Sequence, residues 1–91
     1  MKSKSIIHND DSCYICGSYP TETHHCIHGT ANRRLADKDG LTVNLCHICH
    51  MNLHDKGLYD RELQKLAQTK WMEYYNKGTE EWIKRYGKSY L

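Results

Sequence analysis

The sequence predicts a small α+β domain that a zinc ion holds together, followed by two helices. Three observations lead to this prediction. The chain has 91 residues, of which 38% are hydrophobic and none is phenylalanine, so a purely hydrophobic core would be marginal. All five cysteines and six of the seven histidines lie within residues 13–57. Residues 58–91 contain neither, and instead hold both tryptophans and five of the seven tyrosines.

The N-terminal segment, residues 1–12, is polar and charged except for Ile6 and Ile7, and we expect a flexible tail. It has no apolar run of the length of a secretory signal, and no stretch of the chain is long and apolar enough to predict a membrane span. We therefore expect a cytoplasmic chain with reduced thiols, in which paired cysteines bind metal rather than form disulfides. The formal net charge of +2 is too small to indicate nucleic-acid binding by itself.

Residues 13–57 are expected to form two strands and a short helix. A first strand is expected over Tyr19–Ile27, and a second over Leu41–Leu45, where apolar and polar residues alternate. The segment between them, Gly29–Gly40, is expected to be a loop. From Cys46 onward the sequence suits a helix that ends at Gly57.

Residues 58–91 are expected to form two helices that pack on the first unit, so that the chain is a single domain. The first helix has Asp60 as its predicted N-cap and Gly78 as its stop, and the second, Glu80–Tyr86, is capped by Thr79 and followed by Gly87. The first carries a stripe at helical spacing, formed by Leu63, Leu66, Ala67, Trp71, Tyr74 and Tyr75. We interpret this stripe as a buried helix face rather than a ligand site.

Two Cys-x-x-Cys pairs predict a structural zinc site formed by Cys13, Cys16, Cys46 and Cys49. Two-residue spacing lets both thiolates of a pair bind one tetrahedral ion, and the 29 residues between the pairs allow the chain to return to it. The alternative, a redox-active pair, normally comes with a βαβ pattern, which neither pair has. Four filled positions leave no open coordination site, so this zinc would contribute folding energy rather than chemistry. Cys26 remains unpaired, and we interpret it as a small buried residue.

A second cluster consists of four histidines, His24, His25, His50 and His54. His50 and His54 lie one helical turn apart on the same face and form a bidentate metal site. Three histidine ligands leave coordination positions free, as in a catalytic site, and a fourth imidazole is available for proton transfer. A divalent ion beside a neutral imidazole and basic residues suits a phosphodiester substrate. The basic residues nearby in the sequence are Arg33, Arg34 and Lys38.

These histidines, together with the sequence Leu45-Cys46-His47-Ile48-Cys49-His50, resemble the HNH endonuclease family and its ββα-metal fold. The Cys-x-x-Cys-Gly motif at Cys13–Gly17 and the ending Tyr86–Leu91 are similar to those of small HNH-type proteins of bacteriophages and prophages. The resemblance covers about residues 13–91. It implies a zinc-stapled ββα-metal, treble-clef-like unit over residues 13–57, with a C-terminal helical extension over residues 58–91.

The resemblance also implies a function, which is metal-dependent hydrolysis of DNA that leaves 5′-phosphate and 3′-hydroxyl ends. Carried over by position, His24, His50 and His54 would bind a divalent ion, and His25 would be the general base. The ion differs between members and is Mg²⁺, Mn²⁺, Ni²⁺ or Zn²⁺. Weak sequence specificity is expected, with DNA as the partner and the chain a monomer or a homodimer, in the host cell cytoplasm if it is phage-encoded.

Two features depart from the family pattern. Its middle asparagine would fall near Gly40–Leu41, so Asn44 is assigned the orienting role, with Asn32 as the other candidate. Adjacent residues on a regular strand point to opposite faces. If His24 is a metal ligand and His25 the general base for one phosphate, the strand must end or twist at His25.

Several alternatives remain open at this stage. His47 shares the helical face of His50 and is a competing ligand, and His28 either contacts the substrate or lies in a loop. The basic residues either contact phosphate or are solvated loop charges. The chain as a whole is alternatively a non-catalytic zinc module that binds nucleic acid or protein, or an accessory subunit of a phage DNA-packaging machine with terminase as its partner.

Overall fold

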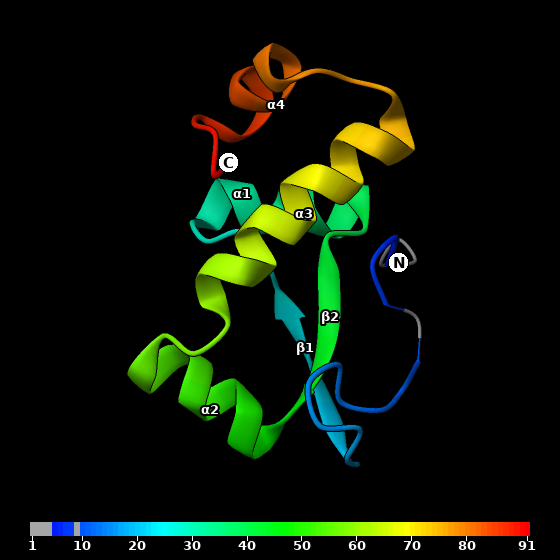
Figure 1. Cartoon of the computed structure of the whole chain (residues 1–91), viewed down its shortest axis with the longest axis vertical. Helices are drawn as coiled ribbons and strands as arrows, with labels where there is room; N and C mark the ends of the chain where they lie inside the picture. The colour runs from blue at the N-terminus through cyan, green and yellow to red at the C-terminus, as the bar shows by residue number, and fades with distance from the viewer. Residues whose placement is uncertain (1–4, 9) are drawn as a thin grey trace.

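The computed structural model describes residues 5–8 and 10–91, which form a two-stranded antiparallel sheet and four helices (Figure 1). The elements in chain order are β1 (Thr21–His25), α1 (Thr30–Asp39), β2 (Thr42–Cys46), α2 (His47–Lys56), α3 (Asp60–Tyr75) and α4 (Thr79–Tyr86). The predicted α+β class is confirmed. Among the residues described, no helix combines the length and the apolar character needed to cross a membrane.

The sheet places the end of β1 beside the start of β2. His24 lies opposite Val43, and His25, the last residue of β1, lies opposite Thr42. β1 is shorter than predicted. β2 begins one residue later than predicted, because the Leu41 N–H donates to the Ala36 carbonyl at the end of α1 instead of joining the sheet. β1 therefore ends at His25, which is where it has to end or twist if His24 and His25 are to reach one site.

The prediction of a loop over residues 29–40 is wrong, because α1 occupies this segment. The segment has neither glycine nor proline between Thr30 and Asp39 and is rich in good helix formers. Its basic residues Arg33, Arg34 and Lys38 are exposed, whereas Ala36 and Asp39 are buried. Gly40 ends the helix in the left-handed conformation, with its N–H on the Ala36 carbonyl.

α2 follows β2 directly and confirms the predicted helix. Cys46 is its N-cap residue, and its sulfur accepts the Cys49 N–H at 3.5 Å. Gly57 ends the helix in the left-handed conformation, with its N–H on the Leu53 carbonyl. The helix packs against both strands, and Cys49 of the second cysteine pair lies in its first turn.

α3 and α4 confirm the two predicted C-terminal helices, with corrections at their ends. Asp60 is the first helical residue rather than the N-cap, and α3 ends at Asn76 in the left-handed conformation instead of at Gly78. Gly78 instead precedes α4, where its N–H donates to the Glu81 carboxylate at 2.9 Å. Thr79 is likewise the first residue of α4 rather than its cap, and Gly87 follows the helix as predicted.

The core joins α1, α3 and α4 through one buried carboxylate. Trp71 of the predicted stripe is buried, whereas Tyr74 at its far end is exposed. The Asp39 carboxylate accepts from Trp71 Nε1 at 2.9 Å, from the Tyr86 hydroxyl at 2.6 Å and from two nitrogens of Arg85 at 2.6 and 2.8 Å. This network fixes the two C-terminal helices to the end of α1, which Figure 1 shows lying behind α3.

Residues 1–4 and 9 of the expected flexible tail lie outside the described residues. The described part of that segment contacts the core. The Ile6 N–H donates to the Gly40 carbonyl at 2.9 Å, and the Ser5 hydroxyl donates to the Thr42 carbonyl. Ile6 and Ile7 pack against the core cluster.

Candidate functional site

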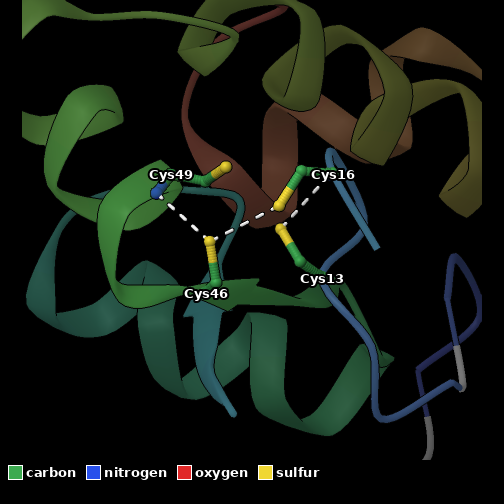
Figure 2. Close-up of side chains that lie close together, drawn as sticks. All are labelled: Cys13, Cys16, Cys46 and Cys49. Carbon is green, nitrogen blue, oxygen red and sulfur yellow. Dashed lines mark hydrogen bonds between the residues drawn. The ribbon is translucent and has the colours of Figure 1, made fainter. Parts of the chain in front are cut away.

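The four cysteines predicted to bind zinc come together at the junction of β2, α2 and the segment before β1. One sulfur from each of the four lies within 4.8 Å of the other three. Figure 2 shows the sulfurs of Cys13, Cys16 and Cys46 turned toward one another, and the Cys16 and Cys46 sulfurs are 3.6 Å apart. Ligands about 2.3 Å from a tetrahedral zinc ion lie about 3.8 Å apart, so the donor set fits zinc.

Both cysteine pairs use the same backbone turn. The Cys16 N–H points at the Cys13 sulfur at 3.5 Å, as the Cys49 N–H does at the Cys46 sulfur. Burial raises the pKa of Cys13, but backbone N–H groups that stabilise the thiolate outweigh it and lower the pKa to about 6. A thiolate is the form of cysteine that binds metal, so the backbone favours a ligand here.

The second cluster brings together three of the four predicted histidines. His54 Nε2 lies 3.0 Å from His50 Nε2, which in turn lies 3.3 Å from His24 Nδ1. Two nitrogen ligands about 2.05 Å from a tetrahedral ion would be about 3.3 Å apart, so the spacing fits one divalent ion. The structure thus brings together the three residues to which the sequence assigned the divalent ion.

The carboxylate of Glu22 determines which nitrogen of His50 faces the cluster. Its Oε1 lies 2.5 Å from His50 Nδ1, and because a carboxylate only accepts, Nδ1 carries the proton. The lone pair of the neutral ring is then on Nε2, the nitrogen that faces His24 and His54. A carboxylate on the outer nitrogen of a histidine is the usual support for a metal ligand.

His24 is the buried member of the cluster. Burial, and then the proximity of His50, lower the pKa of His24 to about 4, so its imidazole is neutral at neutral pH. Its Nε2 is buried without a hydrogen-bond partner among the described residues, while Nδ1 faces His50. A neutral ring is the form that binds a metal ion.

His25 lines the same cavity as the three clustered histidines, although it is adjacent to His24 in β1. This cavity of about 210 Å³ is also lined by Thr23, His28 and Arg33. His25 Nε2 lies 2.7 Å from Asp37 Oδ1, which places the proton on Nε2. The lone pair of the neutral ring is then on Nδ1, so the pair resembles the histidine–carboxylate arrangement of general bases.

The basic residues divide between two adjoining cavities. Arg33 lines both the histidine cavity and a neighbouring cavity of about 220 Å³, which Arg34 and Asp37 also line. Both arginines are exposed on α1. Lys38 is exposed on the same helix but is not among the residues that line either cavity.

Asn44 does not lie at the histidine cavity. Its side-chain amide donates to the Asp10 carbonyl at 2.6 Å and so holds the N-terminal segment to β2. The other candidate, Asn32, donates from its amide to the His28 carbonyl at 3.1 Å and to the Tyr86 carbonyl at 3.4 Å. Of the two candidates, Asn32 is therefore the one whose side chain holds the loop that follows His25.

The remaining cysteine and histidines occupy distinct environments. Cys26 is fully buried, and burial raises its pKa to about 12, as expected of a small core residue. His47 is exposed, with Nδ1 3.6 Å from Glu22, and it is not part of the metal-ligand group. His28 lines the histidine cavity and pairs through Nε2 with Asp60 Oδ1 at 2.7 Å.

Sequence reasoning missed the three carboxylates, Glu22, Asp37 and Asp60, that hold histidines of this site. Glu22 lies two residues before His24 on β1 and so shares its strand face, which is a signal that the sequence does contain. Asp37 and Asp60 come from separate helices, and nothing in their spacing from the histidines indicates a contact. Comparison of the chain with known protein families, curated proteins and solved structures finds no match.

Proposed function

We propose that this chain is a metal-dependent endonuclease that hydrolyses phosphodiester bonds in DNA, built as a zinc-stapled ββα-metal unit. The observation that carries the proposal is that His25, paired with Asp37, lines one cavity with the three-histidine cluster. A histidine–carboxylate pair supplies a base, and a three-histidine group supplies an ion site with free coordination positions. Phosphodiester hydrolysis needs both within reach of one substrate group.

In this proposal His24, His50 and His54 would hold a divalent ion, which would supply positive charge for the phosphate and for the departing oxygen. His25 takes a proton from water on Nδ1, while Asp37 holds Nε2–H and stabilises the resulting imidazolium. The oxygen of that water attacks phosphorus as the bond to the 3′ oxygen breaks. The 3′ oxygen takes up a proton from solvent, which leaves a 5′-phosphate and a 3′-hydroxyl. Arg33 lines the cavity and provides a positive charge for a phosphate oxygen.

The zinc site supports this chemistry because two of its cysteines lie at the start of the helix that carries His50 and His54. Cys46 ends β2 and caps α2, and Cys49 lies in the first turn of α2, directly before His50. A zinc ion on the four sulfurs therefore fixes the part of α2 that presents two of the three histidines. We assign this zinc a structural role, because all four ligand positions are filled.

Binding in this proposal is directed mainly at the phosphate backbone. Arg33 and Arg34 are exposed on one helix, at the cavity and beside it. Phosphate contacts position a protein on DNA without reading its sequence, so weak sequence specificity is expected.

Nicking of a supercoiled plasmid tests the proposal. The natural chain with one zinc ion should nick the plasmid when Mn²⁺ or Mg²⁺ is added. His25→Ala should retain its zinc and its circular dichroism spectrum and lose nicking by about 100-fold or more, as expected for loss of a general base. His47→Ala is the matched control, because His47 is exposed outside the cluster, and it should nick normally. Equal nicking by His25→Ala and the natural chain would refute the role of His25.

A further inference from the structure

A second, larger cavity adjoins the histidine cavity. It has a volume of about 520 Å³, and His28 lines both cavities. Its walls come from α1, α3, the end of α4 and the segments before α1 and after α4, and its polar and aromatic lining includes Asn32, Gln64, Lys88 and Tyr90. A group in this cavity would therefore lie beside His28, which also lines the histidine cavity.

The wall after α4 is held rigidly. Trp82 Nε1 donates to the Lys88 carbonyl at 2.9 Å. The fully buried Gln68 of α3 donates to the Ser89 hydroxyl at 3.0 Å and accepts the Tyr90 N–H at 2.6 Å. A buried glutamine is costly unless it is satisfied, and here most of its hydrogen-bonding capacity fixes this short segment. These hydrogen bonds fix the backbone of the segment from which Lys88 and Tyr90 line the cavity.

Some of the polar groups that line the cavity keep hydrogen-bonding capacity for a ligand. Within the described part of the chain, Gln64 makes no side-chain hydrogen bond, and Lys88 forms no ion pair. The Asn32 amide nitrogen is used by two carbonyls, which leaves its oxygen as an acceptor. The Tyr90 ring lies at the same wall, with Lys88 Nζ 5.3 Å from its centroid. Amide groups beside an aromatic ring and a cation are the combination that binds a nucleobase.

We propose that this cavity binds the base of the nucleotide next to the scissile phosphate, an inference that rests on the proposed nuclease function. Tyr90 would contact the base plane, and Gln64 and Asn32 would bond its edge. A base reaches a side cavity only when it leaves the stack of a duplex. The substrate class is therefore DNA in which a nucleotide at the cleavage point is unpaired or readily leaves the stack, as in a single strand or an underwound supercoiled plasmid, rather than a relaxed duplex.

Equilibrium binding tests the inference without requiring cleavage. The probes are a fluorescein-labelled single-stranded DNA octamer and the same octamer with abasic sites throughout, measured by fluorescence anisotropy with no added Mg²⁺ or Mn²⁺. The natural chain should bind the base-containing octamer roughly 10-fold more tightly, which is typical of one base on an aromatic side chain. Gln64→Ala and Tyr90→Leu should each lose most of this difference, whereas Lys65→Ala, exposed on the same helix outside the cavity, should retain it.

Equal binding of the two octamers by the natural chain would overturn the inference, as would an undiminished difference in Gln64→Ala. The Gln64 side chain makes no hydrogen bond among the described residues, so this variant tests the cavity even if Tyr90→Leu is unstable. Hydrolysis of bis(p-nitrophenyl) phosphate with Mn²⁺ tests the nuclease proposal separately, since this diester has no base. Hydrolysis without base preference refutes the base cavity alone, and base preference without hydrolysis refutes the nuclease proposal alone.

Discussion

Glu22→Gln tests whether the three-histidine cluster is a metal site, independently of any activity. The Glu22 carboxylate lies 2.5 Å from His50 Nδ1, and this bond lowers the pKa of Glu22. Glutamine keeps an oxygen acceptor of the same size but removes the negative charge, so His50 becomes a weaker ligand. Loss of such a supporting carboxylate weakens metal affinity by about 10- to 100-fold. Because the Glu22 side chain is 47% exposed, we expect the low end, about 10-fold.

Isothermal titration of Ni²⁺ into the zinc-loaded protein measures this effect. Glu22→Gln should bind Ni²⁺ about 10-fold more weakly while it retains its structural zinc, because the Glu22 carboxylate pairs with His50 and His47 rather than with a cysteine. Glu62→Gln, an exposed acid in the first turn of α3, is the control and should bind Ni²⁺ as the natural chain does. Unchanged Ni²⁺ affinity in Glu22→Gln, or equal weakening in both variants, would show that this carboxylate does not support a metal ligand.

Three further predictions follow from the same contacts. Cys46→Ser should lose the structural zinc and most of the folded state, as metal content and circular dichroism would show, and a stable fold without zinc would contradict the structural role. Asp37→Asn should reduce nicking by roughly 10- to 100-fold with metal content unchanged, since it weakens the group that orients His25, and an unchanged rate would exclude that role. Burial and the bond to Asp39 raise the pKa of Tyr86, so this residue stabilises the fold below about pH 10 and the contribution is lost as pH rises through the raised value. Denaturant unfolding of Tyr86→Phe should therefore show a smaller loss of stability above pH 10 than the natural chain, and an equal loss would contradict the assignment.

The cysteine and histidine spacing predicted both clusters because metal ligands must come from fixed points on short turns and helices. Two cysteines separated by two residues share a turn, and His50 and His54 share a helix face, so local geometry was enough. The strand histidine His24 was placed by the resemblance to the HNH family. It joins the cluster because β1 is antiparallel to β2, which leads directly into α2.

What the sequence did not predict depends on contacts between distant segments. The loop expected over residues 29–40 is helix α1, because the basic residues that suggest a polar loop lie on the exposed side of a helix. Because no helix is predicted there, the contact of Asp37 with His25, which Asp37 makes from α1, is not predicted either. Asn44 was preferred over Asn32 on position alone, and the structure shows Asn44 holding the N-terminal segment instead.

In the proposed function, an ion at His24, His50 and His54 serves phosphodiester hydrolysis, while the cysteine site only supports the fold. Titrating Mn²⁺ into the zinc-loaded protein, with bound ions counted by native mass spectrometry and plasmid nicking followed in parallel, tests this claim most directly. We expect one zinc ion that is retained throughout and a nicking rate that rises in proportion to occupancy of a second ion. Full occupancy of the second site without nicking, or nicking that is complete before a second ion binds, would contradict it.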